Sequence, residues 1–113
     1  MHNRISALKM DNYINLSNQY IQILDASRKI IDEKFNAPFY VLFWDEPYII
    51  NNNFDLTNYL LQKLELMNFN IVKVSESTNE LSFDKLKIAH DGHPNIDANK
   101  LNAIALKNII QAQ

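Results

Sequence analysis

Two side chains near the carboxyl end of the chain, those of Asp91 and His93, belong to types that move protons. A histidine takes a proton from a hydroxyl group near neutral pH, because its unperturbed pKa is about 6.5. A carboxylate bound to its other ring nitrogen fixes the tautomer and stabilises the imidazolium ion. Gly92 permits an unusual backbone angle between them, and Pro94 with the helix predicted after it would hold His93 rigidly. Asp91 and His93 can therefore form an acid–base pair inside one tight loop.

The same loop has two other interpretations. It can be a simple turn followed by a helix cap, in which case neither side chain does chemistry. His90, Asp91 and His93 also place three potential metal ligands within four residues. A metal site would need a further ligand from elsewhere in the chain, and the sequence does not point to one.

The elements that must position this loop follow from the spacing of apolar residues. They recur at helical spacing from residue 11 to 35, with Asp11 as the expected N-cap. Residues 39–44 form a continuous apolar run, which is typical of a strand buried on both faces of a parallel sheet. The pattern further predicts a helix over 54–67, a strand over 71–74, a loop over 75–84 and a helix over about 96–111 capped by Asn95 or Asp97.

The order strand, helix, strand predicts a parallel, right-handed βαβ unit, whose strands end at one edge of the sheet. Open α/β sheets bind ligands at that edge. This topology brings five chemically active residues towards one rim: Asp45, Glu46, His90, Asp91 and His93. Asp45 and Glu46 could act there as a general acid pair, although carboxylates at a strand end usually cap or solvate the turn. Trp44, Tyr48 and Phe54 could line a pocket, but core packing is the better expectation.

The predicted sheet is too thin to be stable by itself. Two strands make a marginal sheet, and a strand that is apolar on both faces needs neighbours. Either further strands come from residues 2–9 and 85–89, or a second chain completes the sheet.

Length and composition exclude several functional classes. The chain has 113 residues, a formal net charge of -2, no cysteine and one glycine, Gly92. One domain with one core is expected, without disulfides, thiolate chemistry or a glycine-rich phosphate loop. No basic stripe offers itself to nucleic acid, and the longest apolar run, 37–44, is too short to span a membrane. The first ten residues are too polar for a signal peptide, so a cytoplasmic location is the default expectation.

The stretch from Asp91 to Ala105 reads Asp-Gly-His-Pro-Asn-Ile-Asp-Ala-Asn-Lys-Leu-Asn-Ala-Ile-Ala. It resembles the closing block of the SGNH (GDSL-type) hydrolases, in which an acid and a histidine lie in a loop after the final strand and precede a helix. The resemblance implies that His93 is the general base and Asp91 its orienting acid. It also implies part of a flavodoxin-like, three-layer α/β/α fold with a small parallel sheet. Specific motif residues cover 91 to about 106, and only general architecture covers 11–90.

The sequence departs from that family pattern in two respects. The acid lies two residues before the histidine, whereas the commoner position, three before, is held by His90. The Gly-Asp-Ser nucleophile block and the blocks that donate to the oxyanion are absent. An acyl-transfer site needs nucleophile, base and oxyanion donors together, so the chain is expected to be incomplete as a catalyst by itself.

Two functional hypotheses follow. In the first, residues 1–113 are a single domain equivalent to the C-terminal portion of an SGNH esterase or acyl hydrolase. The chain is then a fragment or half of a split enzyme, and the serine lies on a missing N-terminal segment. In the second, the chain is a non-catalytic α/β module that binds a partner or forms a homodimer by joining sheets edge to edge. Neither hypothesis requires a cofactor.

Overall fold

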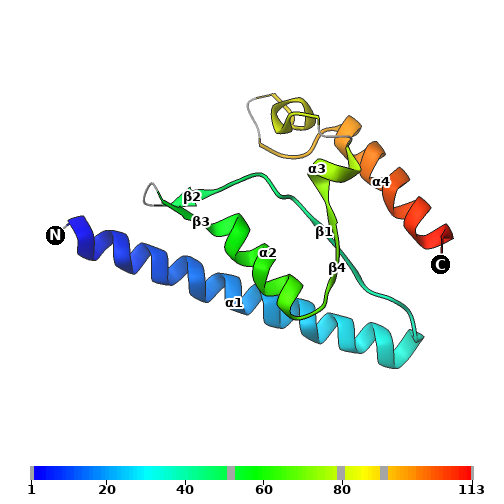
Figure 1. Cartoon of the computed structure of the whole chain (residues 1–113), viewed down its shortest axis with the longest axis horizontal. Coiled ribbons are helices and arrows are strands. Elements are labelled where there is room, and N and C mark those ends of the chain that lie inside the picture. Colours follow the sequence, from blue (N-terminus) through cyan, green and yellow to red (C-terminus); the bar gives the residue numbers. More distant parts are fainter. Residues whose placement is uncertain (1, 51–52, 79–80, 90–91, 113) are drawn as a thin grey trace. The chain divides into compact units, whose positions relative to one another are not determined.

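The computed structural model describes residues 2–50, 53–78, 81–89 and 92–112, with side chains from residue 10 onward. Helices and two small sheets of two strands each make up the described chain (Figure 1). This agrees with the predicted mixed α/β class, while the three-layer arrangement stays a prediction. The chain forms two compact units that interleave in sequence. Unit 1 comprises residues 1–40 and 47–70, and unit 2 comprises residues 41–46 and 71–113.

Unit 1 is built on one long helix, α1, which runs from His2 to Phe35 (Figure 1). The helix begins well before the predicted N-cap, so the prediction for Asp11 is wrong. Residues 2–10 contain neither glycine nor proline, so nothing in them stops the helix. At its other end Asn36 has a φ of 47°, and Pro38 follows. Asparagine tolerates this left-handed conformation, which ends helices.

A short hairpin and a second helix complete unit 1. Strands β2 (Ile49–Ile50) and β3 (Phe54–Asp55) pair antiparallel and lead into helix α2 (Leu56–Leu66). The Asp55 side chain caps α2 by accepting hydrogen bonds from the backbone N–H groups of Thr57 and Asn58. Helix α2 contacts α1. The buried apolar residues of the unit are Ile21, Ile50, Leu64 and Phe69.

Arg28 fastens the end of α2 to α1. One guanidinium nitrogen donates to the carbonyl oxygen of Met67 at 2.9 Å, and the other donates to Asp25 at 2.8 Å. Its guanidinium carbon lies 3.8 Å from the centre of the Phe69 ring, a cation–π distance. The hydrogen bond from Arg28 is also the main reason why the pKa of Asp25 lies below its usual value, with Lys29 contributing. These contacts of Arg28 thus hold the carboxyl end of α2 against α1.

The second sheet consists of β1 (Tyr40–Phe43) and β4 (Asn70–Lys73). At the start of the strands, Asn70 Nδ2 donates to the carbonyl oxygen of Phe39 at 3.1 Å. Beyond their ends, the backbone N–H of Ser75 donates to Asp45 at 2.9 Å. The start of β1 thus lies beside the start of β4, and the end of β1 lies beside the end of β4. The two strands therefore run parallel, as predicted.

Unit 2 continues from this sheet through helix α3 (Val74–Ser77), a 3₁₀ turn (Phe83–Leu86) and helix α4 (Ile96–Gln111). Val74, Leu86 and Ala98 form its buried core, and the aromatic rings of Trp44 and Phe83 pack against them. The loop predicted over 75–84 is therefore partly helical, because Val74 and the buried Thr78 hold one helical turn against the core. The predicted bounds of α4 are confirmed.

The structure corrects two expectations about the sheet. Strand β1 is not buried on both faces, because Leu42 is 42% exposed while Val41 and Phe43 are buried. In the described part of the chain, neither residues 2–9 nor residues 85–89 add a strand to it. The former belong to α1, and the latter contain the end of the 3₁₀ turn and a single bridge from Lys87 to Pro94.

Candidate functional site

The loop that carries His93 is closed at its base by backbone hydrogen bonds. Lys87 and Pro94 form an isolated antiparallel bridge, and the N–H of Ile88 donates to the carbonyl oxygen of His93 at 2.8 Å. Gly92 has a φ of 56°, the left-handed region that favours glycine. The His93 side chain is exposed beside it. His90 and Asp91 lie outside the described residues, and so do both the predicted Asp91–His93 pair and the metal-site alternative.

Asn95 holds this loop to the helix that follows. Its side-chain oxygen accepts from the N–H of Ala98 at 2.9 Å and caps α4, as predicted for one of the two candidates. Its side-chain nitrogen donates to the carbonyl oxygens of Lys85 at 2.7 Å and Lys87 at 3.3 Å. Its backbone N–H donates to Leu86 at 2.7 Å. The Pro-Asn pair after His93 therefore has a structural role that is independent of any chemistry.

Asp45, at the end of β1, is occupied in capping the next helix. One carboxylate oxygen accepts from the backbone N–H of Ser75, and the other accepts from its hydroxyl group. Ser75 lies in the first turn of α3, where orphan N–H groups need acceptors. Of the two interpretations of Asp45, the structure supports the turn cap.

Glu46 ties the end of β1 to the base of the His93 loop. Its carboxylate accepts from the ammonium group of Lys87 at 2.6 Å and from the indole nitrogen of Trp44 at 3.1 Å. Burial opposes ionisation of Glu46, but the hydrogen bonds from Lys87 and Trp44 outweigh it and hold its pKa below the usual value. A lowered pKa is the reverse of what a general acid needs near neutral pH. The predicted common rim is thus seen in part, because the ion pair with Lys87 connects Glu46 to the base of the His93 loop.

The three aromatic residues considered as pocket walls have packing roles. The Trp44 and Phe83 rings lie 5.4 Å apart in the core of unit 2. In unit 1, the Tyr48 ring lies 6.0 Å from that of Tyr13, and the Phe54 ring lies 5.7 Å from that of Tyr59. Trp44 thus packs against a core as expected and Phe54 is half-buried, but Tyr48 is 52% exposed, so the expectation of core packing is wrong for Tyr48.

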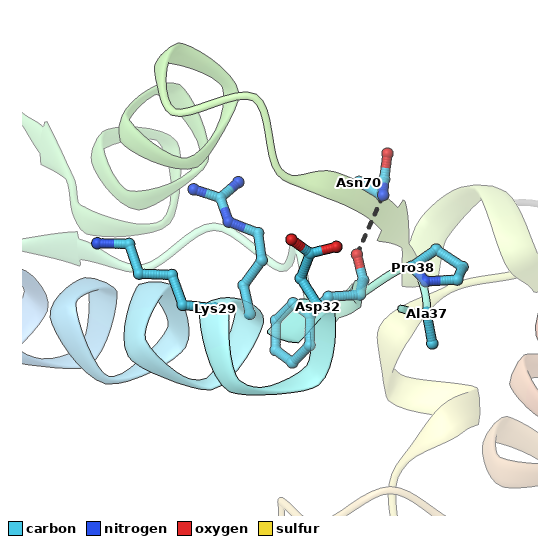
Figure 2. Close-up of a pocket in the computed structure, with 7 residues that line it drawn as sticks. Lys29, Asp32, Ala37, Pro38 and Asn70 are labelled. Atoms are coloured by element: carbon cyan, nitrogen blue, oxygen red, sulfur yellow. Dashed lines mark hydrogen bonds between the residues drawn. The ribbon is translucent and has the colours of Figure 1, made fainter. Parts of the chain in front are cut away.

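Sequence reasoning missed an open cleft at the carboxyl end of α1, which holds about 320 Å³ (Figure 2). Its walls are formed within unit 1 by Arg28, Lys29, Asp32, Ala37, Pro38, Phe39 and Asn70. Two of these lining residues are joined by the hydrogen bond from Asn70 to the carbonyl oxygen of Phe39, which Figure 2 draws as a dashed line from Asn70. The turn after α1 creates the cleft, and the Asn36-Ala37-Pro38 break was its only signal in the sequence. Lys29 and Asp32 bring opposite charges to it, and Arg28 is engaged with Asp25 and Met67.

The described residues contain neither a cluster of metal ligands nor a helix able to span a membrane. Within residues 2–50, 53–78, 81–89 and 92–112, no three histidine, aspartate or glutamate side chains gather as a metal site would require. Nor does any helix in these ranges combine the length and apolar character needed to cross a membrane.

Comparison of the chain with protein-family models, curated proteins and solved structures finds no match.

Proposed function

We propose that the chain is a non-catalytic α/β module that associates with a second copy of itself, which completes the β1–β4 sheet. One observation carries this proposal. The sequence left two ways to complete the sheet, and the described residues supply no third strand from 2–9 or 85–89. A strand from outside the 113 residues is the way that remains, and in this proposal a second copy of the chain supplies it.

The exposed surface of β1 supports this proposal. In a sheet of two strands, each strand keeps one edge of unpaired N–H and C=O groups, which is a template for pairing with another chain. Leu42 projects from β1 and is 42% exposed. Covering what remains exposed of this side chain would contribute about 1 kcal/mol, on the scale of ~2 kcal/mol for a fully buried leucine.

The chemistry of the sheet end also favours a non-catalytic role. Asp45 caps α3, and Glu46 is held in an ion pair with Lys87. Both carboxylates thus stabilise unit 2, and the pKa of Glu46 is lowered, whereas a proton donor near neutral pH needs a raised one.

The proposal is tested by the mass of the protein in solution. Leu42→Lys places a charge at the proposed interface and should lower the mass measured by sedimentation equilibrium. Leu66→Lys is the matched control, since Leu66 is 79% exposed on α2, in unit 1. An equal mass for wild type and Leu42→Lys would refute sheet completion by a second copy.

The conformation of Gly92 favours a second candidate, the C-terminal portion of an SGNH-type esterase with a three-layer α/β/α fold. A φ of 56° at Gly92 and the capped helix after Pro94 hold His93 in a defined loop beyond a parallel strand pair. In this proposal His93 is the general base, Asp91 orients it, and the serine lies on sequence outside the 113 residues.

Two measurements test the second candidate. A Gly-Asp-Ser block in the genomic sequence upstream of Met1 would support it, and the absence of such a block in any frame would remove the fragment hypothesis. Any hydrolysis of a short-chain nitrophenyl ester by the chain should be lost in His93→Ala. Hydrolysis that survives this substitution would show that His93 is not the base.

A further inference from the structure

A second apolar surface runs along α1, the long blue-to-cyan helix in Figure 1. Leu16, Ile23 and Ile30 are spaced by seven residues and are 61%, 64% and 50% exposed. Tyr20, 43% exposed, lies between the first two. At 3.6 residues per turn these four side chains fall within an arc of about 80°. We call them the α1 stripe, and their seven-residue spacing is the one that lets two helices pack along a shared seam.

The α1 stripe adjoins the face that α1 uses within unit 1 but is not covered by it. Ser17 and Ile21 are buried there, and Leu24 and Ile31 are half-buried beside them. At 3.6 residues per turn Tyr20 and Ile31 lie about 20° apart around the helix, so the α1 stripe and the buried face form one broad apolar surface, of which the fold of unit 1 covers one side. An amphipathic surface helix normally turns a charged or polar face to water on the other side.

The surroundings of the α1 stripe are uncharged over its first half. From residue 12 to 24 the sequence contains no charged residue at all. The exposed neighbours of the stripe are the amides Asn12, Asn15, Gln19 and Gln22. Depletion of charge around apolar and aromatic side chains is the composition of interface centres rather than of solvated surface.

Charge also selects the partner and its direction. In a two-fold contact the same patch meets itself, so it must be self-complementary. Lys34 continues the line of the α1 stripe, four residues beyond Ile30. In a parallel pair the two Lys34 ammonium groups would lie together and repel each other. In an antiparallel pair centred on Ile23, Lys34 lies opposite the uncharged Asn12 of the other copy.

We propose that α1 docks antiparallel against α1 of a second copy of the chain, with Ile23 beside the two-fold axis and Leu16 opposite Ile30. This contact goes beyond the proposed sheet contact, because it uses another surface. With both contacts each chain binds two neighbours, so the assembly has four chains or more. With the α1 contact alone it is a dimer.

Sedimentation equilibrium on the sheet variants Leu42→Lys and Leu66→Lys and on two variants of α1 separates the two contacts. Ile23→Lys puts a charge at the centre of the α1 stripe, and Gln22→Lys is the matched control with the same charge one position off it. Ile23→Lys should lower the mass about twofold, and Gln22→Lys should leave it unchanged. Far-ultraviolet circular dichroism shows whether each variant keeps its helices.

The possible outcomes distinguish the proposals. If Ile23→Lys and Gln22→Lys have the same mass as wild type, the α1 contact is wrong, and a mass lowered by Leu42→Lys alone then still supports sheet completion. If Ile23→Lys alone lowers the mass, the α1 contact stands and the sheet contact falls. A wild-type protein that sediments as a single chain of 13.2 kDa overturns both.

Cross-linking tests the relative direction of the two helices. The sequence contains no cysteine, so only the introduced residues can form disulfides. Under mild oxidation, a mixture of Leu16→Cys and Ile30→Cys chains should form disulfide-linked dimers between unlike chains, since the proposed register brings these positions together. Leu16→Cys alone should give few dimers. Dimers formed as readily by Leu16→Cys alone would show a parallel pair and overturn the antiparallel arrangement.

Discussion

Asn95 offers the sharpest test of how the His93 loop is built. It joins two functions in one side chain: its oxygen caps α4 through Ala98, and its nitrogen donates to the carbonyl oxygens of Lys85 and Lys87. Substitutions can separate these functions. Asn95→Ala removes both, whereas Asn95→Asp keeps the capping oxygen and loses the two donated hydrogen bonds.

The expected magnitudes follow from these contacts. Loss of a helix cap costs about 1 kcal/mol. The two bonds from Asn95 Nδ2 should together contribute about 1 kcal/mol, because one is solvent-exposed and the other is long at 3.3 Å. We therefore expect Asn95→Ala to destabilise unit 2 by about 2 kcal/mol and Asn95→Asp by about 1 kcal/mol. At ordinary urea dependences, the larger loss lowers the unfolding midpoint by about 1 M.

The single tryptophan of the chain reports on the unit in question. Trp44 packs against the core of unit 2, so its fluorescence in a urea titration follows the unfolding of that unit. Asn99→Ala, at an exposed position one turn along α4, is the control and should leave the midpoint unchanged or slightly higher. If Asn95→Ala unfolds at the midpoint of the control, Asn95 does not hold the loop. If the unfolding midpoint of Asn95→Asp falls as far as that of Asn95→Ala, the helix cap contributes nothing to stability.

Three further predictions concern other contacts. The pKa of Glu46 is lowered on folding, so the stability it confers is present above its ordinary pKa of 4.5 and lost as the pH falls through the folded value. Urea midpoints should therefore fall less with acidification in Glu46→Gln than in wild type, and equal slopes would exclude this role. At Gly92 an added Cβ meets no atom within 4 Å, so Gly92→Ala should cost only the left-handed backbone, about 1 kcal/mol, and Gly92→Asn less. Equal unfolding midpoints for these two variants would disprove the backbone conformation. Arg28→Lys should destabilise unit 1 by about 1 kcal/mol in urea titrations followed by circular dichroism, because lysine loses the forked contact to Met67 and Phe69. Lys29→Met is the control, and an unfolding midpoint of Arg28→Lys equal to that of Lys29→Met would refute this role of Arg28.

The elements that the sequence predicted well are those specified by local signals. Pro94 and Asn95 mark the start of α4, and the apolar runs at 39–44 and 71–74 mark the two parallel strands. The hairpin of β2 and β3 was not predicted, because strands of two residues are too short to show alternation. The start of α1 was placed nine residues too late, because Asp11 has the type of an N-cap but lies inside a sequence that stays helical.

The candidate site was predictable as a set of residues and less so as a set of roles. The topology argument correctly placed Glu46 near the base of the His93 loop, since parallel strands end at one edge. It could not show that Lys87 neutralises Glu46 or that Ser75 takes both oxygens of Asp45. These partners lie 41 and 30 residues away in the sequence, and only the folded chain brings them together.

Two differences between sequence and structure bear on the proposed assembly. The apolar run of β1 has the composition of a strand covered on both faces, yet Leu42 is 42% exposed. Helix α1 has an apolar surface broader than the part that unit 1 covers, and Ile23 on it is 64% exposed. Each residue of this kind loses up to about 2 kcal/mol of burial that the single chain does not recover. Large apolar side chains are exposed on other elements as well, such as Leu66 on α2 and Ile96 on α4. Those of β1 and α1 are the ones whose pattern fits a contact between copies, since one lies on a strand with an open edge and the others form a stripe at seven-residue spacing. The variants Leu42→Lys and Ile23→Lys test that argument separately, and their double variant should be a folded single chain of 13.2 kDa.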